Sequence, residues 1–124
     1  MKNLEATMSV LKAVVIDNPE IKKVIIAKLE RINNSHLNII VKLNKKIHEI
    51  SEENKDIEST MKTLEENKTM LTVKEYESIV KTRGKLIEKN NEKRFALITR
   101  VKEHKSVISN NRKNIDVLQN EDSE

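Results

Sequence analysis

Apolar residues recur at alternating steps of three and four along most of this chain, and few folds other than long helices accommodate such spacing. The pattern is uninterrupted in the second half, where it holds from Val73 to Leu118. Its members are Val73, Tyr76, Val80, Arg83, Ile87, Asn90, Arg94, Leu97, Val101, His104, Ile108, Asn111, Ile115 and Leu118. A seven-residue repeat places one stripe along one side of a helix, so we expect coiled-coil-like packing of this segment.

The first half of the chain carries a second apolar stripe, which begins after the single proline. We assign to it Ile25, Leu29, Ile32, His36, Ile39, Leu43, Ile47, Ile50, Asn54, Ile57, Met61 and Leu64. Two successive steps of four, from Ile39 through Leu43 to Ile47, predict a stutter that locally unwinds the packing. With one glycine, one proline and 2% aromatic residues, the chain lacks the usual ingredients of sheets, so we expect an all-α fold.

Capping signals divide the chain into three predicted helices. They cover residues 3–16, 19–67 and 73–118. Asn18 suits the N-cap of the middle helix, and Pro19 is tolerated at its first position because the N–H that proline lacks would have no partner there.

The stretch between the two long helices carries a second start signal. Thr72 and Glu75 match the capping box S/T-x-x-E, which predicts that a helix begins there. A start implies that the preceding helix has ended, and Asn67 suits that end because asparagine enters the left-handed region readily. We therefore place a turn at residues 68–71, and we expect a frayed tail at 119–124.

The turn decides between a hairpin and a straight continuous helix. In a hairpin centred near Met70, residues whose numbers add up to about 140 face each other. His36 then faces His104, Leu43 faces Leu97, and the apolar layers match. We favour the hairpin for this reason and keep the straight rod as the alternative.

The complete expected architecture is one domain over residues 1–124. It is an all-α, long antiparallel helical hairpin, coiled-coil-like, with helix 3–16 packed at its open end. A two-helix arm has a thin core, so flanking apolar side chains stay exposed. These are Ile40, Ile79, Leu86 and Ile98. Their exposure predicts a homodimer or larger oligomer in which hairpins form a helical bundle.

Charge is distributed unevenly along the chain. Residues 21–50 and 78–113 are basic, whereas residues 51–77 are acidic and form the tip of the hairpin. The candidate anion or nucleic-acid face comprises Lys81, Lys85, Lys89, Lys93, Arg100, Lys102, Lys105, Arg112, Lys22, Lys42 and Lys45. An acidic protein surface would bind it equally well, and lysine-rich helix faces are often merely solvated. A net charge of +4 is small for a nucleic-acid-binding protein.

Polar residues within the stripes predict register and partner selection, because a polar residue at such a position penalises alignments that leave it unpaired. The residues assigned to oligomer and register specificity are Asn54, Asn90, Arg83, Arg94, Ile79, Leu86 and Ile98. We expect the two arginines to reach carboxylates such as Glu49 or Glu53. Gly84 marks either a close helix approach or a weak point in the helix.

His36 and His104 are predicted to pair in the core, as a buried layer that weakens the fold on acidification. A metal site is the other interpretation of this pair. It is disfavoured because no carboxylate lies three or four residues from either histidine. We therefore predict no metal and no cofactor.

No arrangement of residues in the sequence indicates catalysis, so we predict no enzyme and no small-molecule substrate. No apolar run is longer than that of Val24 to Ala27, which is far too short to span a membrane. We expect a cytoplasmic protein without membrane contact, and the Lys, Asn and Ile bias suggests an AT-rich genome such as that of a phage, virus or low-GC bacterium. If it is viral, it would reside in the host cytoplasm.

The predicted function is that of a non-enzymatic helical interaction protein, an assembly adaptor, scaffold or regulator. It would bind protein partners and associate with itself. The alternative is a nucleic-acid-binding accessory protein in replication or packaging.

Overall fold

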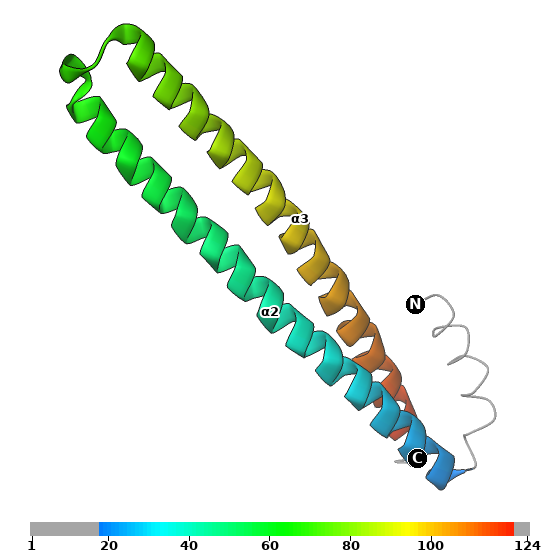
Figure 1. Ribbon diagram of the computed structural model, residues 1–124. Coiled ribbons are helices and arrows are strands. Elements are labelled where there is room, and N and C mark those ends of the chain that lie inside the picture. The colour runs from blue at the N-terminus through cyan, green and yellow to red at the C-terminus, as the bar shows by residue number, and fades with distance from the viewer. Residues whose placement is uncertain (1–17, 121–124) are drawn as a thin grey trace. The chain divides into compact units, whose positions relative to one another are not determined.

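The computed structural model describes residues 18–120 and shows a hairpin of two long helices that pack against each other (Figure 1). Helix α2 spans Pro19–Glu66, the 3-10 turn η1 spans Lys68–Met70, and helix α3 spans Val73–Asn120. The predicted all-α hairpin is confirmed, and the straight rod is excluded. The helix predicted over residues 3–16 lies outside the described residues, and dimerisation stays a prediction because the structure contains one chain.

The start of α2 has the predicted cap. The Oδ1 atom of Asn18 accepts a hydrogen bond from the Ile21 N–H at 3.1 Å, and the Asn18 carbonyl accepts one from the Lys22 N–H at 3.1 Å. The side-chain bond satisfies a backbone donor for which the helix has no partner, and the carbonyl accepts the first regular bond of the helix.

The end of α2 differs from the expected left-handed cap. Asn67 has φ −112° and ψ 14°, and no described residue has a positive φ. Its side-chain Nδ2 instead donates to the Thr63 carbonyl at 2.8 Å. The backbone continues its right-handed winding through η1, where the Met70 N–H donates to the Asn67 carbonyl at 3.0 Å, so a left-handed residue is not needed.

The start of α3 is the predicted capping box. The Thr72 N–H donates to Glu75 Oε1 at 3.0 Å, and the Glu75 N–H donates to Thr72 Oγ1 at 3.1 Å. A cap of this kind stabilises a helix by about 1 kcal/mol. At the far end α3 continues to Asn120, so two residues of the predicted frayed tail are helical.

The described chain divides into two compact units. Unit 1 contains residues 18–41 and 102–120, and unit 2 contains residues 42–101. The core of unit 1 is a cluster of Leu29, Ile115 and Leu118, against which Ile25 and Ile26 pack. The buried apolar residues of unit 2 are Leu43, Ile57 and Val101.

The apolar stripe of α2 is regular, and the predicted stutter is wrong. Ile40 is 7% exposed, whereas Ile39 is 36% exposed, and Asn33 is buried beside them. With Asn33 and Ile40 as members, the stripe runs through Ile26, Leu29, Asn33, His36, Ile40, Leu43, Ile47, Ile50, Asn54, Ile57, Met61 and Leu64, all of them buried or half-buried. The steps of four and three then alternate throughout, because the buried asparagine occupies a position that only an apolar residue was expected to fill.

The asparagine contacts define the pairing of the helices. Asn33 contacts Asn111 in unit 1 and Asn54 contacts Asn90 in unit 2, and the residue numbers of each pair add up to 144. His36 and His104, whose numbers add up to the expected 140, also contact each other, so the expected sum holds for the histidines and is exceeded by four at the asparagine pairs. In α3 the predicted stripe holds, except that Val73 and Arg94 are exposed.

Candidate functional site

The two histidines of unit 1 meet across the helices. The Nδ1 atoms of His36 and His104 are 2.7 Å apart, their ring centroids are 5.0 Å apart, and the ring planes are inclined by 47°. Both side chains are half-buried, where a fully buried layer was expected. Burial, and next the charge of His104, lower the pKa of His36.

Asparagine pairs lie within the core of both units. Asn111 Nδ2 donates to Asn33 Oδ1 at 3.0 Å in unit 1, and Asn90 Nδ2 donates to Asn54 Oδ1 at 2.9 Å in unit 2. Asn54 Nδ2 also donates to Asn91 Oδ1 at 3.1 Å. Asn33 and Asn91 were not predicted. The sequence signal that could have revealed Asn33 is its spacing, because it stands three seven-residue repeats before the assigned Asn54.

The two arginines of the α3 stripe do not behave as expected. Within residues 18–120, neither Arg83 nor Arg94 lies within ion-pair distance of a carboxylate, so the predicted contacts with Glu49 or Glu53 are wrong. Arg94 is exposed and Arg83 is half-buried, so water can solvate both guanidinium groups. A Cβ atom added at Gly84 would meet nothing within 4 Å, so a close helix approach does not explain this glycine.

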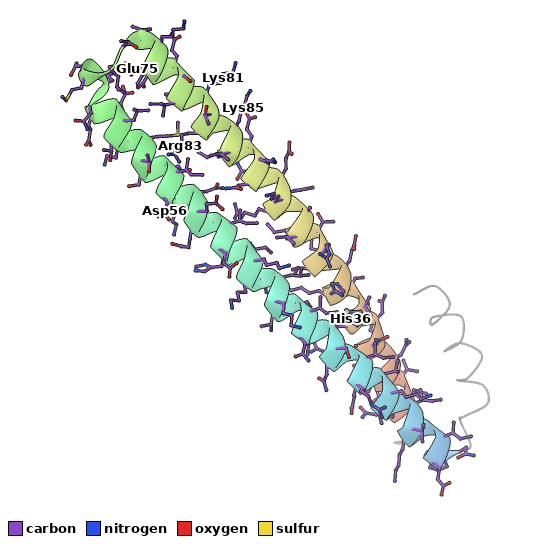
Figure 2. The ribbon with its side chains drawn as sticks, viewed as in Figure 1. His36, Asp56, Glu75, Lys81, Arg83 and Lys85 are labelled. Carbon is purple, nitrogen blue, oxygen red and sulfur yellow. The ribbon has the colours of Figure 1, made fainter. Side chains whose placement is uncertain are left out.

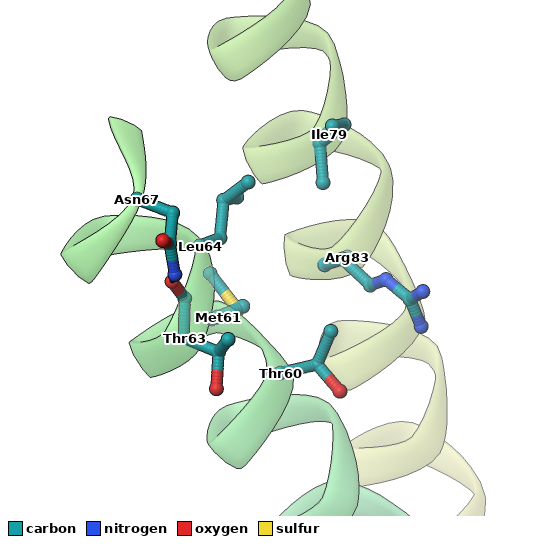
Figure 3. Close-up of a pocket in the computed structure, with 7 residues that line it drawn as sticks. All are labelled: Thr60, Met61, Thr63, Leu64, Asn67, Ile79 and Arg83. Atoms are coloured by element: carbon teal, nitrogen blue, oxygen red, sulfur yellow. The ribbon is translucent and has the colours of Figure 1, made fainter. Parts of the chain in front are cut away.

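A hollow of about 360 Å³ lies near the tip in unit 2 (Figure 3). It is lined by Thr60, Met61, Thr63, Leu64 and Asn67 of α2 and by Ile79 and Arg83 of α3. Three of its polar residues already hydrogen-bond to the backbone of α2, since the side chains of Thr60, Thr63 and Asn67 each donate to a carbonyl four residues earlier. Arg83 supplies the charge on its wall.

At the tip, Glu65 contacts both Tyr76 and Lys68, and these contacts were not predicted. The Tyr76 hydroxyl donates to Glu65, and Lys68 Nζ lies 3.3 Å from the same carboxylate and 5.9 Å from the Tyr76 ring centroid. The hydrogen bond from Tyr76, followed by that from Lys68, lowers the pKa of Glu65, and the same Tyr76 bond raises the pKa of the tyrosine. These exposed contacts join the start of α3 to the end of α2.

An open groove runs along unit 1 between the two helices. Two adjoining hollows of about 470 and 460 Å³ form it, and both are lined by Leu37, Arg112 and Asp116. The remaining lining residues are Glu30, Asn33, Asn34, Ile40, Lys105, Ile108, Ser109, Lys113 and Ile115. We call these residues the unit 1 groove. It has an aliphatic floor and charges of both signs on its walls.

The flanking apolar residues differ in exposure. Ile40 was expected to be exposed, but it is buried in the floor of the unit 1 groove, because it belongs to the regular stripe of α2. In unit 2, Ile79 and Ile98 are half-buried, and Leu86 is 39% exposed.

The predicted basic residues differ in their exposure. Lys22 is only 2% exposed, so it is not part of an exposed basic surface. Figure 2 shows Lys81 and Lys85 on the outer side of α3 in unit 2, while Arg83 lies toward α2. The other exposed members are Lys42, Lys45, Lys89, Lys93 and Arg100 in unit 2 and Lys102, Lys105 and Arg112 in unit 1. Their spacing in the seven-residue repeat distributes those of α3 around the helix.

Residues 18–120 contain neither a candidate metal centre nor a candidate membrane span. No group of three or more His, Cys, Asp or Glu side chains is placed to hold a metal ion in this part of the chain. No helix formed by these residues has the length and apolar character needed to cross a membrane.

Comparison of the chain with protein-family models, with curated proteins and with solved structures finds no match.

Proposed function

We propose that this chain is a non-enzymatic helical interaction protein that acts through protein–protein contacts, including contacts with its own copies. The observation that carries the proposal is the distribution of apolar side chains. Among residues 18–120, eight hydrophobic side chains are buried and ten large ones are exposed. A hairpin with so small a core gains stability when another helix covers its exposed apolar surface.

The unit 1 groove supports the proposal as the surface that a partner helix would use. Its floor contains Ile40, Ile108 and Ile115, and the partly exposed Leu37 projects beside them. A partner helix binds such a groove through aliphatic side chains at steps of three and four. Lys105, Arg112 and Asp116 on the walls would fix its orientation through charge pairs.

Site-specific photo-crosslinking tests this proposal. A photoreactive residue at Leu37 should crosslink to a partner or to a second copy, whereas the same residue at the neighbouring exposed Asn38 should do so far less. Sedimentation of the purified chain across a range of concentrations distinguishes self-association from binding of another protein. A monomer at all concentrations, with equal crosslinking from both positions in cells, would contradict the proposal.

A nucleic-acid-binding accessory protein is the second candidate function. Lys81, Lys85 and Lys89 favour it because they are exposed at four-residue intervals on one side of α3. If they contact phosphates, the affinity for duplex DNA should fall steeply with salt, and replacing all three by glutamine should reduce the slope of log K against log salt by about 3. Undetectable binding at about 50 mM salt would exclude this function.

A further inference from the structure

The contact between His36 and His104 constrains the protons that the pair can carry. A hydrogen bond between two Nδ1 atoms 2.7 Å apart needs a proton on one atom and a lone pair on the other. In the neutral pair, the donor ring therefore has its free lone pair on Nε2, and the acceptor ring has its proton on Nε2. The contact occupies the Nδ1 atom of each ring. The neutral pair can therefore accept a further proton without losing the contact at one atom only, the Nε2 of the donor ring.

Successive protonation has two different effects on this contact. The first added proton binds Nε2 of the donor ring, and the hydrogen bond becomes charge-assisted. The second can bind only Nδ1 of the acceptor ring, because no other lone pair remains. That step removes the hydrogen bond and places two imidazolium ions against each other.

We propose that His36 and His104 form an acid-sensitive clasp, which holds the two helices of unit 1 together while the pair carries at most one added proton and releases them when it carries two. This proposal goes beyond the proposed function, because it concerns the control of unit 1 rather than its partner.

The described surroundings of the clasp offer no compensation for two positive charges. On α2, the residues one turn away are Ile32, Asn33, Ile39 and Ile40, and on α3 they are Arg100, Val101, Val107 and Ile108. Arg100 is the one charged residue among these, and it is a cation. Glu103 and Lys105, which flank His104 in the sequence, are exposed to solvent. Among the described residues, the positions one turn along each helix thus offer no carboxylate that would stabilise a doubly protonated pair.

The pH dependence has a defined sign. Burial and the neighbouring ring lower the pKa of His36 in the folded protein, so the unfolded chain binds more protons as the pH falls below about 6.5. The stability that neutral His36 contributes is therefore fully present above about pH 6.5. It is lost as the pH falls through the lower pKa that His36 has in the folded protein. The lowered pKa values of Glu65 and Glu75 act at lower pH, because carboxylates ordinarily titrate near 4.

The clasp lies next to the unit 1 groove. Leu37 and Lys105 line the groove and directly follow the two histidines in the sequence. Release of the clasp would separate the two walls of the groove. We therefore expect acidification to affect any partner contact made there.

The asparagine pairs supply a matched control variant. His36→Asn with His104→Asn introduces the side-chain pair that α2 and α3 already use at Asn33 and Asn111, which can hydrogen-bond but does not titrate. His48→Asn serves as the second control, because the His48 side chain is 74% exposed.

Thermal unfolding of the full chain between pH 7.5 and pH 5.0 tests the clasp. The wild type and His48→Asn should lose several degrees of Tm over this range, and the double asparagine variant should lose less than half as much. An equal loss in all three proteins would overturn the proposal.

Nuclear magnetic resonance of the wild type with ¹⁵N-labelled histidine gives a test that needs no variant to fold. Two of the three imidazoles should titrate as a coupled pair, in two separate steps. Simultaneous, independent titration of all three rings would equally overturn the proposal.

Discussion

Units 1 and 2 are built from the same two helices but differ in what holds each together. Unit 1 has a packed aliphatic cluster in which Leu29 and Leu118 are almost fully buried. Unit 2 has fewer buried apolar residues, although it contains more of the described chain, and it adds the caps and exposed contacts of the tip. We infer that packing dominates the stability of unit 1, whereas local helix signals contribute more of the stability of unit 2.

Truncating a core leucine should separate the two units most clearly. Leu118 is 0% exposed, so Leu118→Ala should cost about 2–5 kcal/mol of unfolding free energy, because it removes buried methyl groups and leaves a cavity. The matched variant Leu64→Ala, at a half-buried position of unit 2, should cost about 1–2 kcal/mol. Chemical denaturation measures both. Equal costs would show that the two units are packed alike.

The asparagine pairs should matter more in unit 1. Asn111 is 1% exposed, so Asn111→Ala should cost about 1–3 kcal/mol by leaving Asn33 without its partner. Asn90→Ala should cost less, because Asn54 keeps its hydrogen bond to the exposed Asn91.

Replacing both members of an asparagine pair by leucine provides the control. This change should recover most of the lost stability and weaken the preference for a single register. Denaturation gives the free energies, and disulfide trapping of engineered cysteine pairs reports the register. A double-leucine variant as unstable as the single alanine variant would mean that shape at this site, rather than the unpaired amide, accounts for the loss.

Removing the α3 cap should affect unit 2 selectively. Thr72→Ala deletes the hydroxyl that accepts from the Glu75 N–H, at a cost of about 1 kcal/mol. Hydrogen exchange should then accelerate in residues 73–80 and remain unchanged in residues 102–120. The hydrogen bonds with Thr72 also lower the pKa of Glu75. The stability that the ionised Glu75 contributes is therefore present above about pH 4.3, and it is lost as the pH falls through the lower pKa of Glu75 in the folded protein. Uniform acceleration along α3 would mean that the helix opens as a whole.

The smallest expected effect is a gain of stability in unit 2. Gly84→Ala should stabilise the chain by about 0.5–1 kcal/mol, because the added methyl meets nothing within 4 Å and alanine restricts the unfolded chain. A rise in the denaturation midpoint without a change in slope would support this expectation. Destabilisation would indicate that another chain approaches the helix closely at Gly84.

The parts of the fold that depend on local signals could be predicted from the sequence. The caps at Asn18 and Thr72 are of this kind, because a cap is made by residues within one turn of each other. The contact of His36 with His104 was also predicted, through the matching of two stripes. The asparagine pairs add up to 144 rather than 140, a difference of about one turn that apolar matching alone does not reveal.

The remaining errors concern side-chain contacts that helix propensity and apolar spacing do not describe. Ile32 rather than Asn33 was assigned to the apolar stripe of the first long helix. The sequence near an isolated polar residue does not reveal the partner that will hydrogen-bond to it once it is buried. Asn67 was assigned to the left-handed region on propensity, whereas its side-chain bond to Thr63 keeps the backbone right-handed. The groove and the tip hollow depend on side chains from both helices, so no single stretch of sequence predicts them.

The backbone of the connection between the helices has no described position whose conformation requires glycine. Every described residue, including those of η1, has a negative φ, and the turn closes without glycine. Any L-amino acid other than proline can therefore occupy most of its positions without backbone strain. Over evolutionary time the tip can therefore change its charge and side chains while the hairpin persists, independently of the buried asparagine pairs.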